Sequence, residues 1–186
     1  MPESGTIEES ASAVGHHRWV ELRLFELLGG WVAEIPEPQV KVCVATHCHH
    51  HAWHAELFDR RLPGAGDLRP EVLTVPPAEG LVAFFDALAE AQGAEATIEK
   101  LTGVYRVLLP RKITAYAHHL ASASPVADAP TIRSLRLAMA DEIEGWREGE
   151  ALLQSLLASG GEVARAASWQ GRLEGILVAA GGLTGA

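Results

Sequence analysis

The sequence has few of the residues that nucleic-acid binding, disulfide formation or membrane insertion require. Its 15 Lys and Arg residues stand against 24 Asp and Glu, and the formal net charge of −9 argues against nucleic-acid or anionic-membrane partners. No apolar run reaches the roughly 18 residues of a membrane span. The two cysteines, Cys43 and Cys48, lie on different sides of one predicted helix and are too far apart for a disulfide. Reduced thiols predict a cytoplasmic protein.

Aromatic residues make up only 6% of the chain, and the β-branched alternation that is typical of strands is scarce. Alanine, leucine and glycine dominate, which predicts an all-α protein. The length of 186 residues suits a single domain. We therefore expect a disordered polar leader at residues 1–12, one helical domain at 13–180 and a short tail at 181–186.

Apolar residues that recur every three or four positions predict the helices of this domain. We place them at 13–33, 40–62, 79–92, 97–123, 131–158 and 162–180. Two prolines in the link at 35–38 make the first two helices antiparallel neighbours. Residues 63–77, rich in proline and glycine, predict a long surface connection. Pro110 should kink the helix that contains it, because its ring removes one backbone hydrogen bond.

The helix at 40–62 carries five of the nine histidines of the chain within one eight-residue stretch. At about 100° per residue, four of them share the face of the core residues: His47, His50, His51 and His54. Buried imidazoles need hydrogen-bond partners or a ligand. One interpretation is therefore metal ligation, and the other is a set of hydrogen-bonded core histidines.

Two carboxylates also fall in the middle of apolar stripes, Glu21 on the first helix and Glu142 on the helix at 131–158. The inner face of the helix at 97–123 adds Lys112, Tyr116 and His119. Packed helices lie about 8–10 Å apart, so these side chains can meet the histidines. Carboxylates and imidazoles that meet in a dry helical core favour iron or manganese, with zinc as a further candidate.

The order of helices, the long middle link and two partial motifs resemble the ferritin-like superfamily, over residues 13–158. Its members carry one glutamate on each of two bundle helices and Glu-x-x-His on the other two. Glu21 matches the glutamate of the first helix. His51-x-x-His54 and Glu142-x-x-Gly145 occupy the two motif positions, with histidine and glycine where glutamate and histidine are usual.

The resemblance implies an antiparallel four-helix bundle with a metal ion in its core and an iron- or manganese-dependent oxidase or oxygenase activity. Its ligands would be Glu21, His51, His54 and Glu142, with His47 and His50 as alternatives. Tyr116 and His119 would line the cavity.

The helix at 97–123 offers no carboxylate on its inner face, which leaves two other hypotheses open. In one, the polar core is a metal-free network of hydrogen bonds and ion pairs around Lys112. The protein then acts through its surface, as a homodimer or adaptor. In the other, space beside Gly145 and Gly149 forms a small-molecule pocket with Glu142 as base.

Overall fold

The structure, a computed structural model, describes residues 6–183, and these residues form helices without any β-strand. This confirms the predicted all-α class. No helix among the described residues has both the length and the apolar character needed to cross a bilayer. The elements are α1 (Ile7–Val32), α2 (Pro38–Asp59), η1 (Gly66–Leu68), α3 (Pro70–Leu73), α4 (Glu79–Leu88), η2 (Ala94–Ala96), α5 (Thr97–Leu101), η3 (Thr102–Leu108), α6 (Leu109–Ser122), α7 (Ala129–Leu156) and α8 (Gly160–Ala179).

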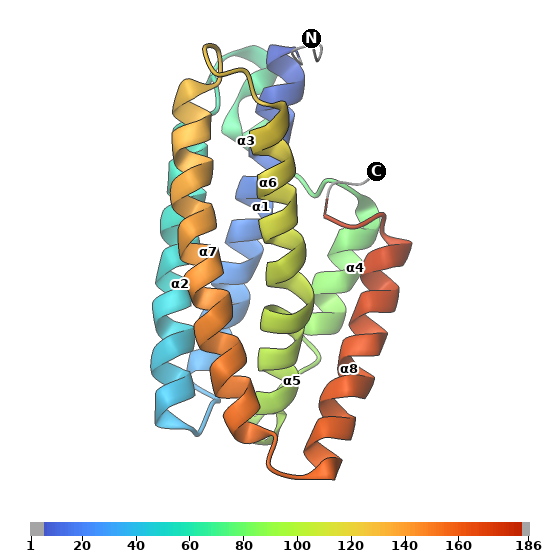
Figure 1. The fold of residues 1–186 in the computed structure, drawn as a ribbon. Helices are drawn as coiled ribbons and strands as arrows, with labels where there is room; N and C mark the ends of the chain where they lie inside the picture. Colours follow the sequence, from blue (N-terminus) through green and yellow to red (C-terminus); the bar gives the residue numbers. More distant parts are fainter. Residues whose placement is uncertain (1–5, 184–186) are drawn as a thin grey trace.

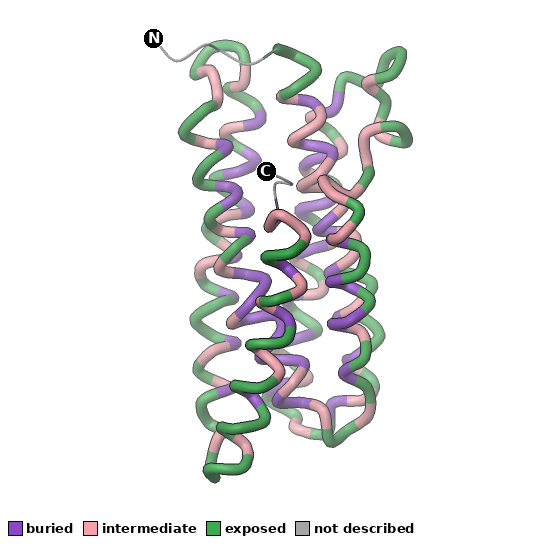
Figure 2. Tube along the Cα trace, turned by 90° about the vertical axis from the view of Figure 1, so that its right-hand side faces the viewer, coloured by how far each residue is buried: buried purple, intermediate pink, exposed green. Residues whose placement is uncertain are grey.

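Four long helical segments run side by side, and a further pair of helices covers one flank (Figure 1). The long segments are α1, α2, the combined α5–η3–α6 segment, and α7. Helices α4 and α8 pack against each other, and α8 also contacts the η3 segment. Buried residues lie on the inward sides of these helices, while the outward sides are exposed (Figure 2). The centre of the four long segments is therefore shielded from solvent along much of its length.

Helix α1 starts at Ile7, inside the stretch 1–12 that was predicted to be a disordered leader. The Thr6 hydroxyl accepts from the Glu9 backbone N–H at 3.2 Å, and the Glu9 carboxylate accepts from the Thr6 N–H at 2.7 Å. This reciprocal pair satisfies two backbone donors that a helix start otherwise leaves free. Ala11 is buried, so the first turns also pack on the domain. The rest of the predicted leader, residues 1–5, lies outside the described residues.

The connection predicted at 63–77 contains two short helices, η1 and α3. Helix α3 packs closely on α1, because a Cβ atom at Gly15 would lie 2.2 Å from the carbonyl oxygen of Leu73. Only a glycine permits that approach of two backbones. The connection is thus held against the domain before the chain enters α4.

A π-helical segment, η3, lies within the helix predicted at 97–123, directly before the part that contains Pro110. It ends at Leu108, directly before α6, in which Pro110 occupies the first turn. A proline in the first turn costs no backbone hydrogen bond, whereas one in a helix interior removes a bond and clashes with the preceding turn. The wider turns before it therefore accommodate Pro110.

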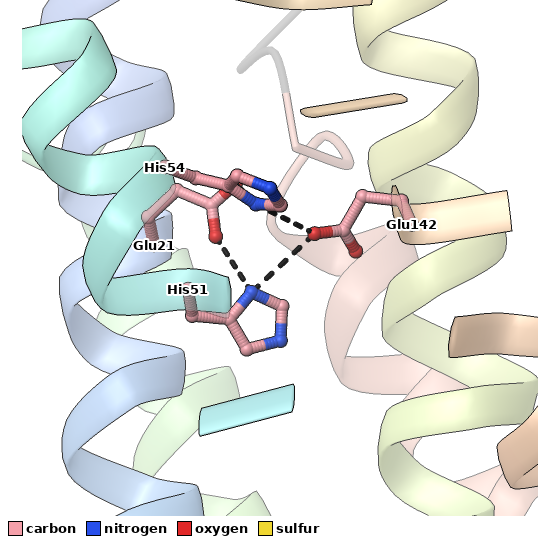
Figure 3. A group of neighbouring side chains, drawn as sticks. All are labelled: Glu21, His51, His54 and Glu142. Carbon is pink, nitrogen blue, oxygen red and sulfur yellow. Dashed lines mark hydrogen bonds and ion pairs between the residues drawn. The ribbon is translucent and has the colours of Figure 1, made fainter. Parts of the chain in front are cut away.

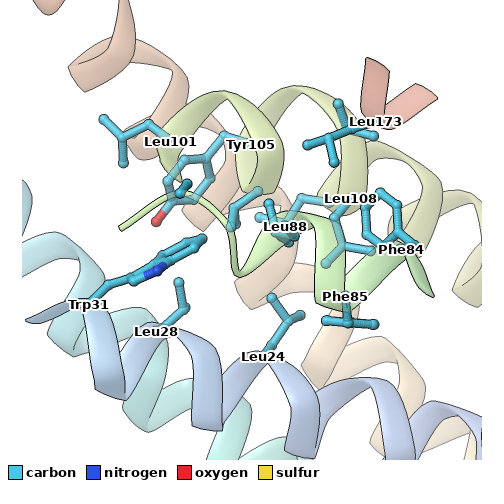
Figure 4. Close-up of a cluster of buried hydrophobic side chains, with 14 of the residues drawn as sticks. Leu24, Leu28, Trp31, Phe84, Phe85, Leu88, Leu101, Tyr105, Leu108 and Leu173 are labelled. Atoms are coloured by element: carbon cyan, nitrogen blue, oxygen red, sulfur yellow. The ribbon is translucent and has the colours of Figure 1, made fainter. Parts of the chain in front are cut away.

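The larger hydrophobic core lies between α1, α4, the η3 segment and α8 (Figure 4). Leu24, Leu28 and Trp31 of α1 lie on one side of this core, opposite residues of α4 and of the η3 segment. The labelled residues of this core are Leu24, Leu28, Trp31, Phe84, Phe85, Leu88, Leu101, Tyr105, Leu108 and Leu173. Burial of each such side chain contributes roughly 1.5–3 kcal/mol. This packing fixes α1 and the η3–α6 segment, from which Glu21 and Lys112 project into the interior.

Close packing at Gly149 of α7 gives a test of this arrangement. A Cβ atom there would lie 2.3 Å from the Tyr105 ring, whereas a Cβ atom at Gly171 of α8 meets no atom within 4 Å. We expect Gly171→Ala to stabilise the protein by about 1 kcal/mol through helix propensity. Gly149→Ala should destabilise it by about 1–3 kcal/mol through overpacking. Urea unfolding of both variants measures the difference, and equal stability would contradict the packing.

Candidate metal centre

Four buried donors from three helices meet in the interior of the domain (Figure 3). Glu21 comes from α1, His51 and His54 come from successive turns of α2, and Glu142 comes from α7. One ligand atom from each residue lies within 4.8 Å of every other. This group, the core centre below, unites residues that are far apart in the sequence and can hold a metal ion.

The distances between these donors are close to those between ligands of one ion. His51 Nδ1 lies 3.4 Å from Glu142 Oε1, and His54 Nδ1 lies 3.3 Å from the same oxygen. His54 Nδ1 is also 3.5 Å from Glu21 Oε1. Ligands at metal distances of 2.0–2.1 Å in a tetrahedron are separated by about 3.3 Å. His51 Nδ1 and Glu21 Oε2 are closer, at 2.7 Å, and form a hydrogen bond.

The Lys112 ammonium group from α6 lies among these donors. Its Nζ donates to Glu21 Oε2 and to Glu142 Oε1, each at 2.7 Å, and lies 3.2 Å from His51 Nδ1. Such distances are those of charge-assisted hydrogen bonds. The ammonium and a metal ion would therefore compete for the same two carboxylates.

Neighbouring positive charge keeps both carboxylates ionised although they are buried. Burial opposes ionisation, but Lys112 and His51 hold the pKa values of Glu21 and Glu142 well below the usual range. Burial alone would also lower the pKa of His54, yet the charge of Glu21 and the contacts with both carboxylates raise it to about 10. Without a metal, two anionic carboxylates thus face a lysine ammonium and a protonated His54.

Neighbouring residues orient the donors of the core centre. Tyr116 donates its hydroxyl hydrogen bond to Glu21. His54 Nε2 lies 3.0 Å from Asp141 Oδ2, which directs the other ring nitrogen, Nδ1, toward the two glutamates. A carboxylate behind an imidazole is the usual support of a metal-bound histidine. Among residues 6–183, neither His54 Nδ1 nor Glu142 Oε2 has a hydrogen-bond partner.

The four residues therefore form a group that could hold a metal ion. Two carboxylates and two imidazoles are donors that transition-metal ions accept. The two atoms without a hydrogen-bond partner, His54 Nδ1 and Glu142 Oε2, are the kind of buried polar atoms that need a ligand. Lys112 is the residue that must move for the ion to enter.

The structure separates the other predicted ligands from this group. His47 belongs to a second cluster with Cys43 and Glu148, about one helical turn from His51. His50 is half-buried and belongs to neither cluster. His50 instead lines a cavity of about 10 Å³ beside the core centre, together with His47, His51, Leu109, Asp141, Glu142 and Gly145.

The small-molecule pocket predicted beside Gly145 and Gly149 is filled by aromatic side chains. A Cβ atom at Gly145 would lie 3.3 Å from the His47 ring, and one at Gly149 would lie 2.3 Å from the Tyr105 ring. These glycines thus make room for the protein's own rings. Little space for a small molecule therefore remains beside these two glycines, where Glu142 was predicted to act as the base.

Of the two residues predicted to line the cavity, Tyr116 borders the core centre but His119 does not contact its four donors. His119 Nδ1 lies 3.0 Å from Nε2 of His17, and the His17 ring packs edge-on against Tyr116 at 4.8 Å between centroids. Both histidines border a separate cavity of about 380 Å³ near the start of α1.

Sequence reasoning missed Asp141 and Glu148, the acidic residues of α7 that bond to His54 and His47. Glu148 is 55% exposed and Asp141 is 31% exposed, so neither lies in an apolar stripe that would have marked it. The proximity of Asp141 to Glu142 in the sequence was the one signal available, and it is a common arrangement on helix surfaces.

No protein-family model matches the chain, and no characterised protein or solved structure matches it. The ferritin-like resemblance stays a prediction from helix order and residue spacing. The geometry of the donor residues is therefore the observation that bears on function.

The buried pair His17 and His119 predicts acid sensitivity. Burial lowers the pKa of His17 to about 3, compared with 6.5 in the unfolded chain. The charge of the neighbouring His119 is the second cause of this lowering. Between these values only the unfolded chain binds the proton, so stability falls as the pH falls. From pH 7 to pH 5, wild type should lose about 2 kcal/mol more than His17→Phe.

Urea unfolding at several pH values measures this difference. The exposed neighbour His118 provides the matched control, because His118→Phe should keep the wild-type dependence. A His17→Phe variant with an unchanged slope would contradict the role of His17.

Proposed function

We propose that this protein binds a divalent transition-metal ion, iron or manganese, in the core centre, with Glu21, His51, His54 and Glu142 as ligands. The observation that carries the proposal is the convergence of these four buried donors at ligand-like separations. Zinc remains compatible with the donors, but two hard carboxylates suit iron and manganese well.

The balance of charge in the core centre supports a metal ion in the place of the Lys112 ammonium group. The two carboxylates carry two negative charges, and a divalent ion balances them as fully as the ammonium and a protonated His54 do together. Lys112 has a long side chain with four rotatable bonds, so its ammonium group is the part of the core centre that would be displaced. The ligand positions themselves need little rearrangement.

The space beside the core centre limits the reaction that an ion could support. The adjoining cavity of about 10 Å³ holds about one molecule of the size of water. Bound iron or manganese would supply one-electron redox chemistry there. We therefore favour an oxidase-type reaction over the oxygenation of a bulky substrate.

The second candidate is a metal-free core in which Lys112 permanently replaces the ion. It is favoured by the two 2.7 Å hydrogen bonds from Lys112 to the carboxylates. In that case the buried network serves the specificity of packing, and the protein acts through its surface, as a homodimer or adaptor. The two candidates differ in what a metal does once Lys112 is removed.

Lys112→Met distinguishes them. In chelator, the variant should lose about 3–5 kcal/mol of unfolding free energy, because two buried carboxylates lose their cation. If the core centre binds metal, Mn²⁺ or Fe²⁺ at a hundredfold excess over Kd should restore about 2.7 kcal/mol. The variant should also bind the ion at least about tenfold more tightly than wild type, which is about 1.4 kcal/mol.

Lys100→Met is the matched control. Lys100 is also buried and donates to Glu34 at 2.6 Å. Among residues 6–183, however, Glu34 belongs to no group of donors that could hold a metal ion. Loss of Lys100 should destabilise the protein without any recovery on addition of metal. A Lys112→Met variant that shows no recovery either would favour the metal-free core.

Metal content gives a direct check on the ligands. Untagged wild-type protein purified without chelator should carry iron or manganese by elemental mass spectrometry, and Glu142→Gln should lose it. Glu144→Gln, an exposed neighbour on α7, should retain the metal. Equal metal content in both variants would exclude Glu142 as a ligand.

A further inference from the structure

A second group of donors lies on the same face of α2, nearer its start. Cys43 and His47 are one turn apart on α2, and Glu148 reaches them from α7. His47 is buried, Cys43 is half-buried, and the Glu148 side chain is 55% exposed. The group is therefore open to solvent on one side, unlike the core centre.

The separations within this group agree with those of zinc ligands. Cys43 Sγ lies 3.8 Å from His47 Nε2, and His47 Nε2 lies 3.2 Å from Glu148 Oε2. Zinc–sulfur and zinc–nitrogen bonds of about 2.3 and 2.0 Å in a tetrahedron separate sulfur from nitrogen by about 3.5 Å. The corresponding nitrogen–oxygen separation is about 3.3 Å. Small side-chain rotations would bring all three donors to one ion.

Tyr105 positions His47 for this role. Its hydroxyl lies 2.7 Å from His47 Nδ1, which leaves Nε2 directed at Glu148. Burial raises the pKa of Tyr105 well above its usual range, so the hydroxyl stays neutral and can accept as well as donate. A metal-bound histidine commonly donates its other ring N–H to an oxygen, and Tyr105 supplies that oxygen.

The backbone around the group is adapted to these two rings. Gly145 and Gly149 leave room for the rings of His47 and Tyr105, and Tyr105 projects from the π-helical η3 segment. π-Helical turns occur frequently at functional sites. The orientation of His47 is thus built from three separate elements, α2, η3 and α7.

We propose that Cys43, His47 and Glu148 form a second metal site, which takes a thiophilic divalent ion of the zinc type. The three protein ligands leave a fourth position on the solvent side, which water would fill. On binding, the Cys43 S–H bond breaks, a sulfur–metal bond forms and the proton passes to bulk water. The proposal is independent of metal binding in the core centre, which contains no sulfur.

Cobalt(II) is the probe that separates this site from the core centre, because only a thiolate ligand gives a sulfur-to-cobalt charge-transfer band in the near ultraviolet. Wild-type protein titrated with Co²⁺ should show this band. Cys43→Ala should abolish it, while Cys48→Ala, at the other free cysteine, should retain it. The His49→Ala/His50→Ala variant should also retain it, which excludes casual binding by the neighbouring histidines.

A second measurement tests the site without any spectroscopic label. Zn²⁺ should slow the alkylation of Cys43 by iodoacetamide, followed by mass mapping, while Cys48 serves as the internal control. His47→Ala should remove the protection. Tyr105→Phe, which keeps the ring and loses only the hydroxyl, should weaken Zn²⁺ binding by about tenfold or more.

The proposal fails if saturating Co²⁺ gives no charge-transfer band with wild type, or if the band survives Cys43→Ala. It also fails if Zn²⁺ leaves the alkylation rate of Cys43 unchanged. Circular dichroism of Cys43→Ala and of the conservative Cys43→Ser confirms that the fold is intact in each comparison. Loss of metal from the core centre would leave all of these outcomes unchanged.

Discussion

The ammonium group of Lys112 between Glu21 and Glu142 is the contact on which the polar interior depends. Two carboxylates buried without a cation would each cost several kcal/mol of desolvation and would repel one another. Lys112 reaches both at 2.7 Å and also contacts His51, so one charge links α6 to α1, α2 and α7. The relative positions of four helices at this level are therefore coupled to the charge at a single point. An ion that replaced the ammonium group would link α1, α2 and α7 but not α6, because Lys112 is the residue that α6 contributes.

Helical periodicity predicted which residues point inward, but not which of them meet. Glu21, His51, His54, Lys112 and Glu142 were all predicted inside, and all are buried. His47 shares their face, yet it forms a different cluster. The reason is the distance along the helix axis. Each residue advances a helix by 1.5 Å, so His47 lies about 10 Å before His54 along α2. The sequence of a helix predicts the face on which a side chain lies. The residues of a neighbouring helix that it meets depend on how the two helices are shifted along their axes, and tertiary packing sets that shift.

The η3 segment shows a second limit of sequence reasoning. All but one of its seven residues are buried, so apolar character there has no preferred face and carries no information on helical phase. Pro110 indicated a disturbance but not its form. The wider turns accommodate the proline and present Tyr105 to His47, while α6 presents Lys112 and Tyr116 to Glu21. One backbone irregularity thus serves both groups of donors.

The two groups differ in the property that selects a metal. The core centre offers oxygen and nitrogen donors in a closed, charge-balanced space, which suits iron or manganese. The second group, Cys43, His47 and Glu148, offers a sulfur ligand and an open side, which suits zinc. Both draw their imidazoles from one face of α2 and one carboxylate from α7, and the core centre draws a second carboxylate, Glu21, from α1. Successive turns of α2 and α7 therefore place chemically distinct donors at different depths, and the donor type together with its burial determines which ion each group would suit.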